Sequence, residues 1–397
     1  MTIKYPLFKA HIPTDEALMQ VGNVLDSGYY NEGVQVTELT KQLEKFLDVK
    51  HLVLVNSCTS ALTMALKLAG VGKDDLVFST SMTCVATNMP IVNVGGIINW
   101  IDVDPLSGMI SADSLGAALA MYARLDALPK AVIVVAWAGV PPELDKISQL
   151  CKYYNVKLIL DAAHAFDAKY AGHPIAEWAD YTCYSFQAIK HFTTGDGGAL
   201  VIKDINDYLI AKSMKWFGLD RDKTKDAKGD WRGQQWDVDI ETPGFKFNMN
   251  NITAAIGLAQ LNSNLKERLQ SFNKNAELLR SLLKDDRLIP QTVNSLATPS
   301  YWVTTFTLLN PLVSNIEMLA VRDSLLKKLN MFGIAAGVVH IPNHEYSAFS
   351  HCYKELPNTD KFYSAQFNLP CGWWLSTSDI NQISYIVLKC LDEILPP

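Results

Sequence analysis

The stretch of residues 157–202 constrains the fold and the chemistry of this chain more than any other. It contains three short apolar runs with strand character, at residues 157–160, 181–186 and 199–202. An acid, Asp161, stands at the end of the first run, and a lysine, Lys190, stands just past the second. Ligands of open α/β sheets bind beyond the carboxyl ends of the strands. Asp161 and Lys190 are therefore each placed where a ligand would bind, and they could face the same ligand.

One carboxylate and one lysine match the needs of pyridoxal phosphate. The lysine binds the aldehyde of this cofactor covalently, and the carboxylate keeps the pyridine nitrogen protonated, so that the ring can accept electrons from the substrate carbon. A strand-end aspartate and a loop lysine also occur in α/β proteins that bind no such cofactor. The pair alone therefore leaves a purely structural role open.

Strand and helix patterns alternate along the chain, which is typical of an α/β protein with a mostly parallel sheet. Further strands are predicted at residues 51–55, 76–79, 96–103 and 131–137. Helices are predicted at residues 61–69, 112–127 and 143–154. In the C-terminal part, short strands and helices alternate at residues 301–308, 315–331, 334–340 and 378–391. We expect a large domain, residues 1–264 with the N-terminal segment, and a smaller C-terminal α/β domain, residues 265–397.

Length, charge and cysteine usage exclude several classes of protein. The net charge of −6 gives no electrostatic reason to expect binding to nucleic acid or to an anionic membrane. No apolar run reaches the length of a membrane span, and the first residues do not resemble a signal peptide, so we expect a cytoplasmic protein. The seven scattered cysteines and the histidines lack the spacing of a zinc site, so we expect no metal.

Two sequence boxes carry a resemblance to a known family. Residues 161–165 read Asp-Ala-Ala-His-Ala, and residues 185–198 read Ser-Phe-Gln-Ala-Ile-Lys-His-Phe-Thr-Thr-Gly-Asp-Gly-Gly. They resemble the DegT/DnrJ/EryC1/StrS family of sugar aminotransferases, and the resemblance runs over about residues 5–395. It implies pyridoxal phosphate as cofactor, the aspartate-aminotransferase-like fold known as fold type I, and a homodimer with shared active sites.

The resemblance also implies roles for individual residues around the cofactor. Lys190 would hold the cofactor, Asp161 would face its pyridine nitrogen, and His164 would bond its 3′-oxygen, although a satisfied core histidine is the alternative. Ser185 matches a hydroxyl that contacts the phosphate. Where the family has an aromatic residue stacked on the pyridine ring, this chain has Cys84, whose thiol would make a weaker contact.

The turn Ser57-Cys58-Thr59, between a predicted strand and a predicted helix, has two interpretations. It is either an anion site at a helix N-terminus or an ordinary N-cap box. In the family this turn is Ser-Gly-Thr and binds the cofactor phosphate. Cys58 replaces the glycine, so we expect the backbone site to survive if the φ angle of Cys58 is negative.

Other candidate residues would reach the substrate or the second subunit. Tyr30 and Asn31 lie in a glycine-bounded loop that is near the substrate in the family and could equally be a plain turn. Trp231 lies in a long charged loop that in the family reaches toward the neighbouring subunit, or is simply solvated. His340 lies in a segment that resembles one bordering the substrate. Lys246 replaces an asparagine that touches the cofactor phosphate of the other subunit, and a lysine could pair with that phosphate as a point charge.

Together these features predict an aminotransferase that moves an amino group from an amino acid, which the resemblance implies is L-glutamate, to a keto sugar. The resemblance favours a nucleotide-linked keto-deoxysugar in the biosynthesis of cell-surface polysaccharide or glycosides. A free or cyclitol ketone is an alternative substrate, and a non-catalytic sensor on the same fold is an alternative function. Sugar 3-dehydratases of the family have a histidine in place of Lys190, and no GxGxxG follows an early strand as a nicotinamide dehydrogenase would require.

Overall fold

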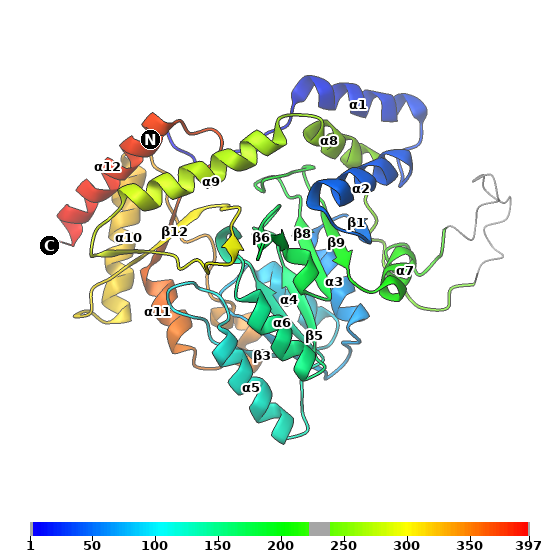
Figure 1. The fold of residues 1–397 in the computed structure, drawn as a ribbon, viewed down its shortest axis with the longest axis horizontal. Helices are drawn as coiled ribbons and strands as arrows, with labels where there is room; N and C mark the ends of the chain where they lie inside the picture. The colour runs from blue at the N-terminus through cyan, green and yellow to red at the C-terminus, as the bar shows by residue number, and fades with distance from the viewer. Residues whose placement is uncertain (1–2, 222–238, 396–397) are drawn as a thin grey trace.

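A seven-stranded sheet organises the first two thirds of the chain in the computed structural model, which describes residues 3–221 and 239–395 (Figure 1). Its strands, in spatial order, are β1 (Leu52–Val55), β9 (Gly198–Ile202), β8 (Tyr181–Ser185), β5 (Lys157–Asp161), β4 (Ala131–Val135), β2 (Leu76–Ser79) and β3 (Ile97–Trp100). The pairs from β8 through β3 are parallel, and β9 runs antiparallel to both β8 and β1. The predicted α/β class with a large, mostly parallel sheet is confirmed.

Helices cover both faces of this sheet. One face is covered by α2 (Val34–Leu47), α5 (Ala112–Arg124), α6 (Leu144–Tyr153) and α8 (Asn251–Leu261), and the other by α3 (Cys58–Leu68), α4 (Val85–Asn93) and α7 (Ile205–Met214). Helix α1 (Thr14–Ser27) packs on α8 instead. Successive side chains of a strand point to opposite faces. Val132 and Val134 of β4 accordingly pack in a core with α2, α5 and α6, whereas Ile133 packs in a separate core with α3, α4 and α7. Burial on both faces explains why the strands are continuous apolar runs.

The C-terminal part has a smaller sheet and a core of its own. Its elements are α9 (Leu265–Leu282), β10 (Leu288–Pro290), β12 (Thr304–Leu308), α10 (Asn315–Met331), α11 (Pro357–Ala365), β13 (Gln366–Leu369) and α12 (Thr377–Ile394). The strands form an antiparallel sheet in the order β10-β12-β13. A small separate sheet joins β11 (Ala297–Thr298), β6 (Lys169–Tyr170) and β7 (His173–Pro174).

Helix α9 carries the chain from one part to the other (Figure 1). Leu265 and Leu269 at its start belong to a core of the large sheet, whereas Phe272 and Ala276 belong to the C-terminal core. The N-terminal segment also reaches this second core, where Tyr5 pairs with Ile334 in an isolated bridge. The division between residues 264 and 265 stays a prediction.

One predicted strand is wrong. Within the described residues, segment 334–340 makes only isolated bridges, one from Ile334 and one from Gly337, and forms no regular strand. Val339 has a φ of 62°, a left-handed conformation that a β-branched residue rarely adopts and that interrupts an extended chain. The predicted strand 301–308 likewise begins only at Thr304, after Tyr301 with a φ of 42°. Both interruptions flank the candidate site.

Along residues 3–221 and 239–395, no helix has both the length and the apolar composition that crossing a membrane would require.

Candidate active site

Two neighbouring strands bring Asp161 and Lys190 to the same edge of the large sheet. Asp161 is the last residue of β5, where it lies beside Cys183 of the parallel strand β8. The chain then leaves β8 after Ser185 and turns, with the backbone N–H of Lys190 donating to the carbonyl of Gln187 at 2.9 Å. The carboxyl ends of parallel strands meet at one edge, which is the usual ligand edge of such sheets.

The carboxylate of Asp161 is buried and held in place by two hydrogen bonds. Its Oδ2 accepts from the hydroxyl of Thr87 at 2.7 Å, and its Oδ1 accepts from the backbone N–H of Ala163 at 3.0 Å. Burial raises the pKa of Asp161, while these two hydrogen bonds and the nearby Lys190 oppose the rise. A cation placed against this carboxylate, such as a protonated pyridine nitrogen, would be stabilised there.

A buried polar network holds Thr87, the hydrogen-bond donor to Asp161, and one of its members, Asn343, comes from the C-terminal part. Thr87 shares a hydrogen bond of 2.8 Å with Thr83, and the side-chain amide of Asn343 donates to the backbone carbonyl of Thr83 at 2.8 Å. The side-chain amide of Asn88 in turn donates to Asn343 at 2.9 Å. Asn343 could not be identified from the sequence, because no local pattern indicates its contact with Thr83, 260 positions earlier in the chain.

The side chain of Lys190 is half-buried, and its amine lies against the indole of Trp302. Its Nζ is 3.6 Å from the ring centre. Burial lowers the pKa of Lys190 to about 8, while Cys84, Asp161 and Cys58 act in the opposite direction. A lysine with this pKa has a substantial neutral fraction near neutral pH, and the neutral amine is the form that attacks a carbonyl carbon.

Three aromatic rings form one layered arrangement beside Lys190. His164 stacks on Trp302 with ring centres 4.0 Å apart, and His340 lies nearly parallel to His164 with their Nε2 atoms 3.5 Å apart. Burial lowers the pKa of His164 well below its ordinary value and the pKa of His340 to about 3, so both rings are neutral near neutral pH. The Nδ1 atom of His164 is buried and has no hydrogen-bond partner among the described residues.

The predicted phosphate site takes the form of a capped helix N-terminus. Ser57 is the N-cap of α3, and its hydroxyl accepts from the backbone N–H of Ser60 at 3.1 Å. Cys58 and Thr59 open the helix, so their amides have no intrahelical acceptor. Cys58 has right-handed helical backbone, which is the condition under which the amide site survives the replacement of glycine. The cap and an anion site are therefore compatible.

Gly198 at the start of β9 is the part of the second box that touches this turn. A Cβ added to Gly198 would lie 2.6 Å from the backbone nitrogen of Cys58, closer than real atoms approach. Ser185, at the end of the neighbouring strand β8, is 8% exposed. Only a glycine at position 198 lets β9 pass so close to the turn.

These residues together fit pyridoxal phosphate. Asp161 suits the pyridine nitrogen, Lys190 the aldehyde, and the unpartnered Nδ1 of His164 a polar group on the ring. The start of α3 suits a phosphate. Cys84, the N-cap of α4, is half-buried, and burial raises the pKa of its thiol, so the contact it offers is that of a neutral thiol.

Two buried tryptophans, Trp137 and Trp302, lie beside the histidine rings of the site. Trp137 meets the rings of His164 and His340 edge-on. Trp302 lies in the turn before β12, and its contact with Lys190 could not be read from the sequence, because no motif marks it.

Other sequence-predicted residues lie in an outer cluster, away from these contacts. The backbone N–H of Asn251 donates to the carbonyls of Tyr30 and Asn31, at 3.0 and 3.2 Å. The ammonium of Lys246 donates to the side chain of Asn248 at 2.7 Å and lies 3.3 Å from the centre of the Trp216 ring. Trp231 lies outside the described residues. The role predicted for Lys246, at the phosphate of the other subunit, stays a prediction.

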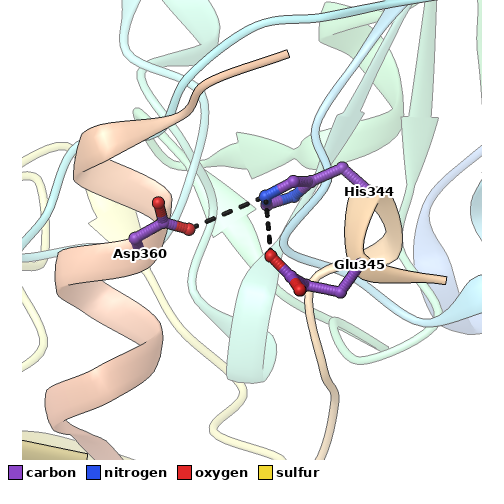
Figure 2. Close-up of side chains that lie close together, drawn as sticks. All are labelled: His344, Glu345 and Asp360. Atoms are coloured by element: carbon purple, nitrogen blue, oxygen red, sulfur yellow. Dashed lines mark ion pairs between the residues drawn. The ribbon is translucent and has the colours of Figure 1, made fainter. Parts of the chain in front are cut away.

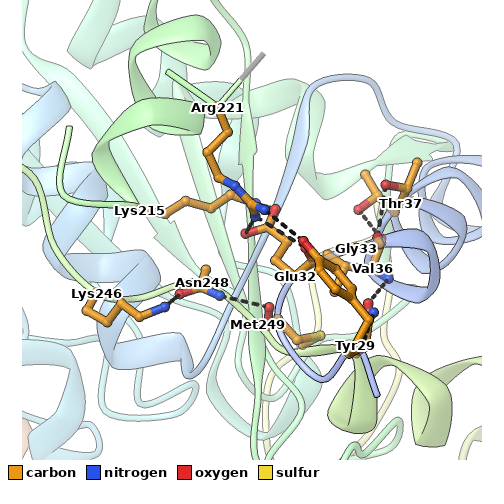
Figure 3. Close-up of polar contacts among 12 residues, drawn as sticks. Tyr29, Glu32, Gly33, Val36, Thr37, Lys215, Arg221, Lys246, Asn248 and Met249 are labelled. Carbon is orange, nitrogen blue, oxygen red and sulfur yellow. Dashed lines mark hydrogen bonds and ion pairs between the residues drawn. The ribbon is translucent and has the colours of Figure 1, made fainter. Parts of the chain in front are cut away.

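Ion pairs and a hydrogen bond hold the loop that carries Tyr30 and Asn31 against the chain after α7, as Figure 3 shows. Glu32 pairs with Lys215 at 2.6 Å and with Arg221 at 3.9 Å. Arg221 also donates to the hydroxyl of Tyr29 at 3.3 Å. The sequence analysis missed these partners, because they come from the end of α7 and the chain after it.

A second polar group, drawn in Figure 2, consists of His344, Glu345 and Asp360. One ring nitrogen of His344 lies 3.3 Å from Glu345 and 3.7 Å from Asp360, and the other is hydrogen-bonded to the hydroxyl of Ser81 at 2.6 Å. Both carboxylates are about half-exposed. We interpret the group as an anchor that joins the 343–345 turn to α11 and to the turn after β2.

Comparison with known proteins agrees with this site. The family model described as "DegT/DnrJ/EryC1/StrS aminotransferase family" matches residues 12–388. The chain is 28% identical over 374 residues to the UDP-4-amino-4,6-dideoxy-N-acetyl-beta-L-altrosamine transaminase of Campylobacter jejuni, covering 91% of each chain. It is 29% identical over 384 residues to the UDP-4-amino-4-deoxy-L-arabinose–oxoglutarate aminotransferase of Shewanella sediminis, covering 93% of this chain and 94% of the other.

Solved structures give the same result for the fold. The sugar aminotransferase CalS13 of Micromonospora echinospora superposes with a TM-score of 0.85 at 28% identity, covering 97% of this chain and 99% of the other. AtS13 of Actinomadura melliaura superposes with a TM-score of 0.86 at 31% identity, covering 98% and 99%. The predicted fold class and the resemblance are confirmed, and the chain belongs to the DegT/DnrJ/EryC1/StrS aminotransferase family.

Proposed function

We propose that this aminotransferase uses pyridoxal phosphate to move an amino group from L-glutamate to a nucleotide-linked keto-deoxysugar, in the biosynthesis of a cell-surface polysaccharide or glycoside. The observation that carries the proposal is the amine of Lys190, which has a lowered pKa and lies at the same sheet edge as the buried Asp161. The names of two relatives, a UDP-amino-sugar transaminase and a UDP-sugar–oxoglutarate aminotransferase, support the substrate classes.

Bound pyridoxal phosphate supplies an aldehyde that takes up an amino group and a ring that accepts electrons from the substrate carbon. Asp161 would keep a proton on the pyridine nitrogen, because its buried negative charge is stabilised by a positive partner. The unpartnered nitrogen of His164 would orient the ring through the 3′-oxygen. The first amides of α3, with the hydroxyls of Ser57 and Ser185, would hold the phosphate.

Lys190 would hold the cofactor between turnovers and move the proton during turnover. The amine of Lys190 would also be the strongest candidate to accept the proton that the donor Cα loses and to give it back during the transfer. A pKa of about 8 suits both directions of this transfer near neutral pH. In the net reaction, the donor leaves as a 2-oxo acid, and the keto carbon of the sugar gains the amino group and one hydrogen.

The proposal includes a homodimer in which each active site is shared. Lys246 would then pair with the cofactor phosphate of the other subunit, and Tyr30, Asn31, Trp231 and His340 would border the sugar. The support is the family membership and the exposed ammonium of Lys246. A cytoplasmic location is also part of the proposal, because all seven cysteines are free thiols, as is usual in a reducing compartment.

A free or cyclitol ketone remains the alternative acceptor, and a non-catalytic sensor remains the alternative function. The sensor is disfavoured because a binding protein has no need of a lysine with a lowered pKa. The two kinds of ketone differ in whether a nucleotide is required for recognition. Turnover of the free sugar at the rate of the nucleotide sugar would favour the alternative acceptor.

The test is the visible absorbance of the purified protein with added pyridoxal phosphate, before and after L-glutamate. The proposal expects a yellow band that L-glutamate bleaches and that an added keto sugar restores. A band that L-glutamate leaves unchanged would contradict the proposed donor. The lack of any band would favour the sensor.

A further inference from the structure

Trp302 makes an unusual set of contacts for a buried tryptophan. It is 2% exposed, and its ring is stacked on Phe8 at 4.5 Å and on His164 at 4.0 Å between ring centres. Its indole N–H donates to the backbone carbonyl of Ile189 at 2.8 Å, one residue before Lys190. The amine of Lys190 lies 3.6 Å from the ring centre. One side chain thus contacts the backbone before Lys190, the amine of Lys190 and the ring of His164.

We propose that Trp302 is a positioning residue, which holds the amine of Lys190 and the ring of His164 in the positions that the cofactor requires. Phe8 of the N-terminal segment keeps the Trp302 ring in place. The inference rests on the proposed role of Lys190. It adds two residues to the site, Phe8 from the N-terminal segment and Trp302 from the C-terminal part, and neither lies in the family boxes at residues 161–165 and 185–198.

The hydrogen bond to Ile189 restrains the backbone, and the ring face restrains the amine. The hydrogen bond to the part-buried carbonyl of Ile189 restrains the turn before Lys190, because a carbonyl that is shielded from water loses free energy when its donor is removed. An ammonium over an aromatic face is attracted by the ring quadrupole, most strongly for tryptophan. The indole therefore gives the long lysine side chain a preferred position whenever its amine is free.

Phe8 reaches Trp302 because the segment before α1 is anchored on the C-terminal core. The backbone N–H groups of Lys4 and Tyr5 donate to the carbonyl of Gly333 at 2.9 Å each, and the N–H of Ala335 donates to the carbonyl of Tyr5 at 2.9 Å. The indole of Trp374 donates to the carbonyl of Pro6 at 3.1 Å. Because Phe8 and His164 both stack on the indole of Trp302, the ring has little freedom to rotate away from Lys190.

A tryptophan that only fills the core would have a different effect when it is changed. Its replacement would lower stability and would leave the pKa of Lys190 unaltered or raise it, because water that reaches the amine reduces its desolvation. A positioning tryptophan makes the ammonium form of Lys190 more favourable, so its removal shifts the pH at which the free amine becomes available. The two roles therefore separate in a pH profile.

The experiment measures the rate at which pyridoxal phosphate forms its yellow band with the protein, as a function of pH. The variants are Trp302→Leu, which removes the aromatic face, and Trp302→Phe, which keeps a face and removes the N–H. The control is Trp373→Phe, a tryptophan that contacts the same N-terminal segment edge-on at His11, 5.1 Å between ring centres. Thermal unfolding of each variant reports folding separately.

We expect Trp302→Leu to move the midpoint of the profile down by about half to one pH unit, because the loss of a cation–π contact disfavours the ammonium. Trp302→Phe should restore most of the midpoint while binding the cofactor more weakly, since the Ile189 carbonyl has lost its donor. Phe8→Leu should shift the midpoint in the same direction by less. An unchanged or raised midpoint in Trp302→Leu would overturn the inference.

The same assay separates this inference from the proposed function. Lys190→Ala should form no band that resists dialysis. If Lys190→Ala forms the band with the parent profile, the proposed role of Lys190 is wrong, and the positioning role of Trp302 is wrong with it. If Lys190→Ala loses the band while Trp302→Leu matches Trp373→Phe, the function stands and only the role of Trp302 is lost.

Discussion

Two lysines of this chain lie over tryptophan rings, and burial lowers the pKa of both, more strongly for the more buried one. The amine of Lys190 is 3.6 Å from Trp302, in a half-buried site where desolvation lowers its pKa to about 8. The ammonium of Lys246 is 3.3 Å from Trp216, on an exposed side chain that also donates to Asn248. The same contact with an aromatic face therefore accompanies an amine with a strongly lowered pKa in one region and, in the other, a more exposed ammonium whose pKa is lowered less. The degree of desolvation, and not the ring alone, separates the two lysines.

The largest effect should follow from Lys190→Ala. The variant loses both the covalent attachment point and the group proposed to move the proton, so turnover should fall by about 10³-fold or more. The measurement is the rate of the L-glutamate half-reaction in a single turnover. Lys203→Ala, which removes an exposed lysine that bonds only the carbonyl of Glu177 among the described contacts, is the matched control. Activity of Lys190→Ala within about tenfold of the parent would refute the assignment.

The next largest effect should follow from Asp161→Asn. Asparagine can still accept the hydrogen bond from Thr87, but the charge that favours a protonated pyridine nitrogen is gone. We expect the rate of the half-reaction to fall by about 10²-fold. Thr87→Val is a graded companion that removes the hydrogen bond and keeps the charge, and it should lose about tenfold or less. Equal losses in the two variants would show that geometry, not charge, is what Asp161 supplies.

A smaller effect should follow from Lys246→Met, and it concerns binding rather than rate. If Lys246 pairs with a cofactor phosphate across a dimer, its loss should weaken the affinity for pyridoxal phosphate by about tenfold, with a weaker salt dependence. The measurement is a cofactor titration at low and high salt. Lys266→Met, which removes another lysine near an aromatic ring, Phe46, serves as control. An affinity equal to that of the control would leave Lys246 without a role at the phosphate.

The inner region was largely predictable from the sequence, because it is built on strand ends. The positions of Asp161 and Lys190 follow from the apolar runs of β5 and β8 and from the rule that places ligands at the carboxyl edge. What could not be predicted comes from distant segments: Phe8, Trp302 and Asn343 reach the site through tertiary packing that leaves no local pattern. The wrong strand at 334–340 has a related cause. Its β-branched residues favour a strand, but the chain turns at Val339 to pass beside the site.

The outer region was the harder one, since charged loops carry no periodicity. The pairing of Glu32 with Lys215 joins residues 183 positions apart, and the glycine-bounded loop that contains Glu32 does not indicate its partner. Such contacts depend on where α7 ends and where the chain next turns, which a single sequence does not determine. Residues at strand ends can therefore be placed from the sequence, whereas the partners of charged loop residues cannot.

The smallest predicted effect tests whether the phosphate site needs a glycine at position 58, as its family has. Cys58 has helical backbone at the start of α3 and a buried side chain, so glycine would relieve no strain there and would add freedom to the unfolded chain. Cys58→Gly should lower the free energy of unfolding by about 0.5–1 kcal/mol relative to Cys58→Ala, measured by urea denaturation. The affinity for pyridoxal phosphate should change by less than about twofold, because the amides of residues 58 and 59 stay in place. A stabilised Cys58→Gly with tighter cofactor binding would mean that the cysteine strains the turn, and that the backbone amides of this helix start are not yet in their best position for a phosphate.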